Sequence, residues 1–202
     1  MKIGILGSGN IGGTLGMKWA KEGHEIIFGV RNKDSTRVRS LLTEIDSGAS
    51  AEHIEDALKK VNVILLAIPH AAVEEVVRKN ASIMGGKIII DATNNFSSPV
   101  ISNIEVISNH VTGANIFRAF NSLGWEVFAN PRFGEITADH YYCGPDNEAR
   151  TQVEQLIAEV GVNPIYVGDL EKAVVVDSLG TLWITLVSQR GVGRHMAFKM
   201  LT

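Results

Sequence analysis

A glycine-rich turn near the amino terminus constrains the fold more than any other part of the chain. The segment Gly7-Ser8-Gly9-Asn10-Ile11-Gly12 follows a short apolar run, Lys2–Leu6, and precedes a helical pattern. A strand, a G-x-G-x-x-G turn and a helix form the opening of a βαβ unit that binds a dinucleotide pyrophosphate. Gly7 permits the tight turn, Gly9 lets the backbone approach the pyrophosphate, and Gly12 lets the helix pack close to the sheet. The amides at the helix start would then face the phosphates.

The spacing of apolar residues after this turn predicts an α/β fold, a doubly wound and mostly parallel sheet of the Rossmann type. The run Asn62–Ile68 is almost continuously apolar, which is typical of a parallel strand covered on both faces. Strands are predicted at residues 2–6, 25–30, 49–51, 62–68, 87–91, 114–120, 141–143 and 163–167. Helices are predicted at residues 11–22, 35–45, 53–60, 70–79, 98–108 and 147–160.

The end of the second predicted strand carries positive charge. A dinucleotide fold that prefers NAD places Asp or Glu here, where the carboxylate accepts hydrogen bonds from the ribose 2′-OH. This chain has Arg31, 24 positions after Gly7, with Lys33 and Arg37 nearby. A guanidinium suits a 2′-phosphate through its charge and its bidentate geometry, so we predict NADP(H). A solvated basic turn is the alternative, and Asp34 would serve NAD if the turn folded differently.

Two further strand ends are expected to border the ribose and the nicotinamide, because ligands of open parallel sheets lie outside the carboxyl ends of the strands. One is Ile68-Pro69-His70 and the other is Ala92-Thr93-Asn94. His70 would bond to the cofactor or the substrate, or else be a surface histidine at a helix start. Asn94 would donate to a ribose or a carboxamide, or else simply form a turn.

The last part of the chain is predicted to be helical. Four apolar residues recur at i, i+3, i+4 and i+7, namely Leu179, Leu182, Trp183 and Leu186. Such a stripe packs in a core or in a subunit interface. We therefore predict an NADP-binding Rossmann domain over residues 1–168 and a small carboxyl-terminal helical segment, residues 169–202, that packs on this domain or on a partner subunit.

Composition limits the partners. The net charge of −3 argues against nucleic acid or an anionic membrane as the main partner. The lone cysteine, Cys143, excludes an internal disulfide and suits a reducing cytosol, so we expect a cytoplasmic protein. No stretch reaches the roughly 18 uncharged apolar residues of a membrane span.

The candidate proton donors indicate the type of chemistry. Carbonyl reduction needs an acid near the developing alkoxide, yet no tyrosine of the chain has a lysine four residues on. Hydride transfer between two flat rings needs mainly stacking, orientation and exclusion of water. No metal-binding motif is present. We therefore expect ring-to-ring hydride transfer, with no catalytic side chain and no metal.

Several motifs together resemble a known family, the NADPH-dependent oxidoreductases that reduce or oxidise the deazaflavin coenzyme F-420, with their broader bacterial relatives. The resemblance covers nearly the whole chain, and it extends to the NADPH-binding domain of the STEAP metalloreductases. The Phe-Asn-Ser-Leu-Gly stretch is the most specific motif. The matching segments are Lys2–Gly12, Arg31, Ile68-Pro69, Asp91–Asn94, Ala119–Gly124, Gly193-Arg194 and Ala197–Lys199.

The resemblance implies a role for each matching residue. It implies a pyrophosphate contact for Ser8, Asn10 and Ile11, and a 2′-phosphate contact for Arg31 with Asn32. The residues it implies along the nicotinamide are Ala67, Ile68, His70, Ala92 and Asn94. Two residues, Asn121 and Trp125, would border the second redox substrate, a deazaflavin or a flavin. The sequence departs from the family pattern at His70, where deazaflavin-reducing members carry an aromatic residue, and at Arg118, where lysine is common.

Two alternatives to this enzyme remain at the level of sequence. One is a non-catalytic NADP(H)-binding sensor or partner subunit, suggested by the small size of the chain. The other is a small imine or carbonyl reductase, which would need a longer helical domain or one shared between subunits. Because the predicted stripe around Trp183 offers such sharing, we expect a homodimer with a small-molecule redox acceptor as its other partner.

Overall fold

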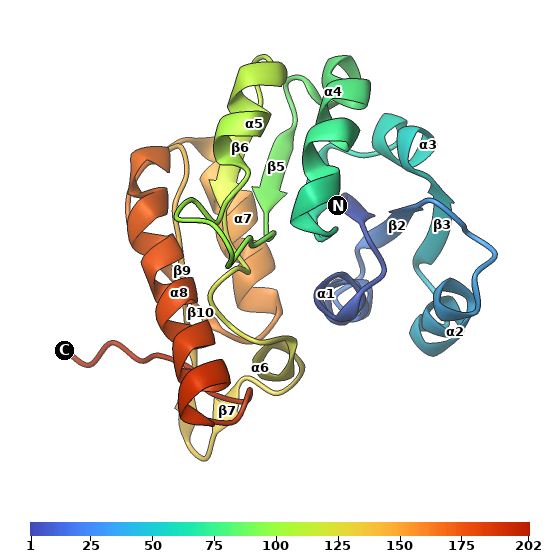
Figure 1. Ribbon diagram of the computed structural model, residues 1–202. Helices are drawn as coiled ribbons and strands as arrows, with labels where there is room; N and C mark the ends of the chain where they lie inside the picture. The colour runs from blue at the N-terminus through green and yellow to red at the C-terminus, as the bar shows by residue number, and fades with distance from the viewer.

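The computed structural model describes residues 1–202, and a six-stranded parallel sheet forms its centre (Figure 1). The strand order is β3-β2-β1-β4-β5-β6. The first three strands are added towards one edge of the sheet and the next three towards the other edge, so the order of addition reverses between β1 and β4. This order is that of a doubly wound Rossmann sheet, and the predicted fold class is confirmed. The strands are β1 (Lys2–Leu6), β2 (Glu25–Val30), β3 (Ala49–His53), β4 (Val63–Leu66), β5 (Ile88–Asp91) and β6 (Asn115–Arg118).

Helices cover both faces of the sheet and bury a separate apolar core on each face. The larger core packs β1, β2, β5 and β6 against α1 (Asn10–Lys21), α2 (Thr36–Ile45), α6 (Trp125–Ala129) and α7 (Glu148–Glu159). The smaller core lies under α3 (Ile54–Lys59), α4 (Val73–Met84) and α5 (Ile104–His110). The two faces alternate along each strand, since Ile3 and Ile5 belong to the first core and Leu6 to the second.

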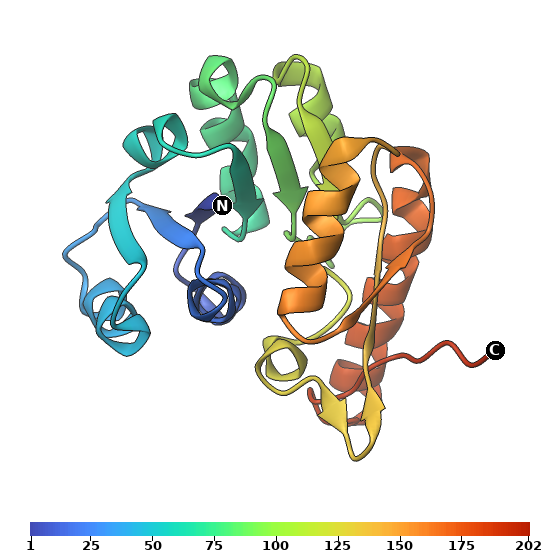
Figure 2. The same ribbon diagram turned by 180° about the vertical axis from the view of Figure 1, so that it is seen from behind.

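A second layer of structure follows β6. Strands β9 (Asp139–Tyr142) and β10 (Asn163–Tyr166) pair in parallel, and a bridge between Arg118 and Cys143 connects this pair to β6 in the antiparallel sense. Strands β7 (Arg132–Phe133) and β8 (Ile136–Thr137) form a small hairpin. Short helix η2 (Leu170–Lys172) leads into α8 (Ala173–Arg190), which runs along the side of the molecule opposite β3 and α2 (Figures 1 and 2).

The structure corrects one helix start. The helix predicted from residue 98 begins only at Ile104, because the chain before it is used for loop contacts. The N–H of Asn95 donates to the carbonyl of Ile101, and the N–H of Asn103 donates to the Asp91 carboxylate at 2.9 Å. Short helix η1 (His70–Ala72) likewise precedes α4, which continues to Met84 rather than ending near residue 79.

The predicted apolar stripe of α8 lies only partly in the core of the chain, with Trp183 buried and Leu179 and Leu186 half-buried. The buried face consists of Val176, Gly180 and Trp183, whereas the side chain of Leu182 is 46% exposed. Helix α8 approaches the chain after β6 closely at Gly180, where an added Cβ would lie 3.1 Å from the carbonyl oxygen of Asn121. The close approach of two backbones, rather than a run of leucines, therefore decides which face is buried. None of the helices has the length and apolarity that a membrane crossing requires.

Candidate functional site

A cavity of about 670 Å³ lies at the carboxyl ends of β1, β2 and β4. These strands are neighbours at the point where the chain reverses across the sheet, which is where open α/β sheets bind ligands. Eight of the residues expected at the cofactor line it, and so does Arg37; the eight are Gly7, Ser8, Gly9, Arg31, Asn32, Ala67, Ile68 and Pro69. The structure thus brings together, in one cavity, segments that are separated by about sixty positions in the chain.

The glycine-rich turn has the geometry that close approach of a ligand requires. Gly7 has φ +108°, and a Cβ there would lie 2.5 Å from the carbonyl oxygen of Ala67. A Cβ on Gly12 would overlap the carbonyl oxygen of Gly7. Gly9, in contrast, has extended backbone and no atom within 4 Å of an added Cβ. The first and third glycines are therefore required by the protein itself, whereas the second keeps space open beside the start of α1.

A basic turn forms the opposite wall of the cavity. Arg31 directly follows β2 and is exposed, and the Asn32 carboxamide accepts a hydrogen bond from the N–H of Asp34 at 3.0 Å. Arg37, on α2, donates from Nε to the carbonyl of Ser8 and from Nη2 to Oδ1 of Asn10, both at 2.9 Å. Arg37 therefore connects the basic turn to the glycine turn, a contact that the sequence did not reveal. Lys33 and Asp34 do not line the cavity.

The remaining residues expected at the cofactor lie around this cavity rather than in its wall. Asn10, Ile11 and Gly12 form the first turn of α1. His70 begins η1 and is half-buried, next to the lining residues Ala71 and Ala72. Ala92 and Asn94 follow β5, one strand further along the sheet.

A buried polar network occupies the carboxyl ends of β5 and β6. Arg118 is fully buried; its Nε lies 2.7 Å from Asp177 of α8 and its Nη1 lies 3.2 Å from Asp91. The same guanidinium donates to the carbonyls of Asp91 and Thr93 and, at 2.6 Å, to Oδ1 of Asn94. The Asn94 amide group in turn donates to the carbonyl of Asn121 at 2.7 Å. Both ends of the Asn94 side chain are thus held by the protein.

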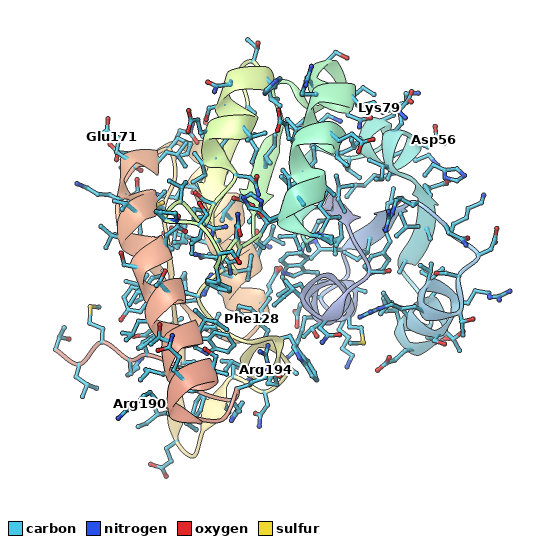
Figure 3. The ribbon with its side chains drawn as sticks, viewed as in Figure 1. Asp56, Lys79, Phe128, Glu171, Arg190 and Arg194 are labelled. Atoms are coloured by element: carbon cyan, nitrogen blue, oxygen red, sulfur yellow. The ribbon has the colours of Figure 1, made fainter.

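The two residues expected beside a second substrate lie after β6. Asn121 is 2% exposed, donates from Nδ2 to Asp177 Oδ1 at 3.2 Å and has an Oδ1 with no partner. Trp125 begins α6 and is half-buried. Arg194, which is labelled in Figure 3 and belongs to the segment after α8, lies 2.6 Å from Glu126 of α6 and stacks over Trp183. The carboxyl-terminal segment therefore contacts the same loop and helix as α8.

Burial shifts the pKa values of three titratable side chains behind this loop away from pH 7. It lowers the pKa of His140 to about 3 and raises the pKa of the Cys143 thiol to about 12. Burial, followed by the hydrogen bond to Glu154, raises the pKa of Tyr142 well above its usual value. None of these three side chains is poised to exchange a proton near pH 7. No group of three or more His, Cys, Asp or Glu side chains is arranged to hold a metal ion.

Comparison with known proteins agrees with this geometry. Residues 2–95, which contain the glycine turn, Arg31 and the ends of β4 and β5, match the family model described as NADP oxidoreductase coenzyme F420-dependent. The F420-dependent NADP reductase of Methanocaldococcus jannaschii is 26% identical over 210 residues, which cover 92% of this chain and 92% of that protein. Metalloreductase STEAP2 of Mus musculus is 27% identical over 189 residues, covering 90% of this chain and 37% of that protein.

A solved structure, a putative F420-dependent NADP-reductase from Arthrobacter sp. FB24, has a TM-score of 0.84 and 21% identity, with 100% of both chains covered. At that identity the likeness shows a shared fold. The resemblance to the coenzyme F420-dependent NADP oxidoreductases and to STEAP metalloreductases that the sequence motifs indicate is therefore confirmed.

Proposed function

We propose that this chain is an NADP(H)-dependent oxidoreductase that transfers a hydride between NADP(H) and a redox acceptor, a deazaflavin such as coenzyme F-420 or a flavin. One observation carries the proposal: the same cavity joins an open glycine turn to a basic turn at the end of β2. The family match over residues 2–95 and the Methanocaldococcus relative support it.

The residues of the cavity fit the cofactor. The open space at Gly9 and the amides that begin α1 suit a pyrophosphate, with Ser8, Asn10 and Ile11 around it. Arg31, with Asn32 and Lys33 beside it, would hold the 2′-phosphate by charge and hydrogen bonds. Arg37 positions the glycine turn through its bond to the Ser8 carbonyl. These contacts bind and orient the dinucleotide and do not take part in the reaction.

The nicotinamide side follows from the strand ends. Ala67, Ile68 and Pro69 would cover one side of the ring, with His70, Ala92 and Asn94 beyond them along the sheet. Asn121 and Trp125 would border the acceptor. Bound NADPH supplies the hydride, and the chain contributes stacking, orientation and exclusion of water. The pKa of His140 is lowered and that of Tyr142 is raised, which agrees with a reaction that needs no side-chain acid.

The same proposal includes the organisation of the protein. Residues 1–168 would form the NADP-binding domain, and residues 169–202 would pack on it through the Arg118–Asp177 ion pair. Three apolar side chains of α8 remain exposed, namely Val174, Val175 and Leu182. We expect them to contact a second copy in a cytoplasmic homodimer that binds neither nucleic acid nor membrane. Size-exclusion chromatography with light scattering tests the dimer, which elution as a monomer would refute.

The first test of function is a titration with NADPH and NADH. Arg31→Ala is expected to weaken NADPH binding by about 1.5–3 kcal/mol, the range for a hydrogen bond to a charged group, and to leave NADH binding unchanged. Arg39→Ala is the matched control, because Arg39 is an exposed arginine of α2 that does not line the cavity. Equal affinity of the natural protein for NADH and NADPH would contradict the role of Arg31, as would an unchanged preference in Arg31→Ala.

The second test is an acceptor screen with NADPH and deazaflavin, flavin, quinone, ferric and imine acceptors. Oxidation of NADPH by the deazaflavin or the flavin is the expected result. Tight NADPH binding without oxidation by any acceptor would favour a sensor or partner subunit, and turnover with an imine alone would favour a small imine reductase. The screen therefore separates the three functions that the sequence left open.

A further inference from the structure

The chain leaves β6 through a conformation that side chains rarely adopt. Phe120 has φ +60°, and Asp46 is the only other non-glycine residue with positive φ. A short polar residue such as Asp tolerates this region, whereas a bulky aromatic residue adopts it only where its surroundings impose it. Phe120 is also 1% exposed, so the strained position lies inside the core. Some contact must hold this turn.

His140, on β9, makes that contact. The N–H of Phe120 donates to Nε2 of His140 at 2.6 Å. The two rings are stacked, with centroids 5.0 Å apart and an interplanar angle of 16°, and the ring of Phe128 meets the imidazole edge-on at 5.5 Å. Helix α6, which carries Phe128, lies beside the segment after β6 (Figure 3). One imidazole therefore supports both the backbone and the side chain of Phe120.

The imidazole has only one form that fits. Because Nε2 accepts a hydrogen bond, the proton of the neutral ring lies on Nδ1, and this atom is buried without a partner. A position that needed only packing would be filled better by an apolar ring, since an unpartnered buried donor is destabilising. The hydrogen bond to the Phe120 N–H therefore gives this position a role that an apolar ring could not fill.

The turn at Phe120 places the next residue, Asn121. Its carbonyl accepts from Asn94 at the end of β5, and its Nδ2 donates to Asp177 of α8. Oδ1 of Asn121 is buried and has no partner in the protein. A different φ at Phe120 would redirect both the carbonyl and the side chain of Asn121.

We infer that His140 is a positioning residue for the hydride acceptor side of the site: it holds Phe120 in the left-handed conformation and so fixes Asn121 against the strand ends and α8. This inference rests on the proposed function for its consequence in catalysis, but the conformational part stands on the contacts alone.

The test compares two isosteric fragments of the imidazole. Gln can place its Oε1 where Nε2 of His140 lies, whereas Asn reaches only as far as Nδ1. His140→Gln should therefore keep the acceptor for the Phe120 N–H, and His140→Asn should lose it. His140→Phe, which keeps a stacked ring without an acceptor, is a second variant that loses the bond but fills the core.

Two measurements are made on each variant. The first is hydrogen exchange of the Phe120 amide, followed by NMR on ¹⁵N-labelled protein. We expect its protection to be lost in His140→Asn and His140→Phe and kept in His140→Gln. The second is steady-state hydride transfer at saturating NADPH with the acceptor found in the screen. We expect kcat to fall by roughly 10–100-fold in the first two variants, to be preserved in His140→Gln, and the Kd of NADPH to be unchanged in all three.

Protection and kcat that persist in both His140→Asn and His140→Phe would overturn the inference, as would equal loss in His140→Gln. A change in NADPH affinity of the same size as the change in kcat would also overturn it, because the effect would then be a general loss of structure. If none of the acceptors in the screen oxidises NADPH in the presence of the natural protein, the proposed function fails. The hydrogen-exchange measurement then decides by itself whether His140 holds the turn.

Discussion

Replacing Arg118 by methionine is expected to be one of the most destabilising single changes in this protein. The side chain of Arg118 is fully buried at the carboxyl end of β6, as is that of Asp91 at the end of β5. Methionine fills a similar length without offering a donor. Asp91 would then remain buried without its ion-pair partner, and Asn94 and Asp177 would each lose a charged donor.

The magnitude follows from burial. Removing one partner of a buried ion pair destabilises a protein by about 3–5 kcal/mol, because the remaining charge is left uncompensated. Asp177 contributes less to this figure, since its side chain is 14% exposed and water can reach it. For a chain of this size each kcal/mol lowers the Tm by roughly 2–4 °C, so that a fall of about 6–20 °C is expected.

The assay is urea unfolding followed by circular dichroism, with a double-mutant cycle. Asp91→Asn in the Arg118→Met background removes the uncompensated charge and should recover part of the lost stability. Arg78→Met is the control, because Arg78 is an exposed residue whose pair with Glu74 spans 4.0 Å. A surface pair of this kind contributes about 0–1 kcal/mol.

The reasoning is refuted if Arg118→Met changes the free energy of unfolding no more than Arg78→Met does. It is also refuted if Asp91→Asn is strictly additive with Arg118→Met, since residues in direct contact should be energetically coupled. In either case the ion pair would not be the origin of the stability of this region.

Two further predictions concern the glycine turn and pH. Gly9→Ala should leave the unfolding free energy nearly unchanged, because an added Cβ meets nothing within 4 Å, but should weaken NADPH binding by blocking the pyrophosphate. Gly12→Ala, whose Cβ would overlap the Gly7 carbonyl, should lower both stability and affinity in the same urea and NADPH titrations. Full NADPH affinity in Gly9→Ala would contradict the assignment of the glycine turn to the pyrophosphate. Because burial lowers the pKa of His140 from 6.5 to about 3, the unfolded chain binds the extra proton between these values and stability falls as pH drops below 6.5. The expected slope of the urea-derived free energy is about 1.4 kcal/mol per pH unit from this group. His140→Gln does not titrate and should remove that share; an unchanged slope would exclude His140 as its source.

Much of the nucleotide-binding half could be predicted from local pattern. The glycine turn, the apolar strand before it and the helix after it are contiguous in sequence, and the periods of two and 3.6 residues distinguish strands from helices. The position of Arg31 follows in the same way, since it is the first residue after β2. The cavity confirms that these segments meet, while the individual contacts assigned to Ser8, Asn94 or Trp125 with a ligand stay predictions.

The chain after β6 was less predictable, because its contacts join residues distant in sequence. The apolar stripe of α8 was expected in a core or in a subunit interface, and only the folded chain shows that Trp183 is buried while Leu182 is 46% exposed. Helix α6, with five residues, and the β7–β8 hairpin, with two residues in each strand, are too short for a periodic pattern to reveal.

The glycine turn and the positions of the main strands along the chain were therefore set by local sequence, since backbone geometry and apolar periodicity depend on neighbours in the chain. The network around Arg118, the bond from Arg37 to the glycine turn and the left-handed Phe120 were decided only by tertiary structure. Each joins groups 20 or more residues apart. Burial then determines which hydrogen bonds must be made, because a polar group removed from water requires a partner that only the folded chain brings near.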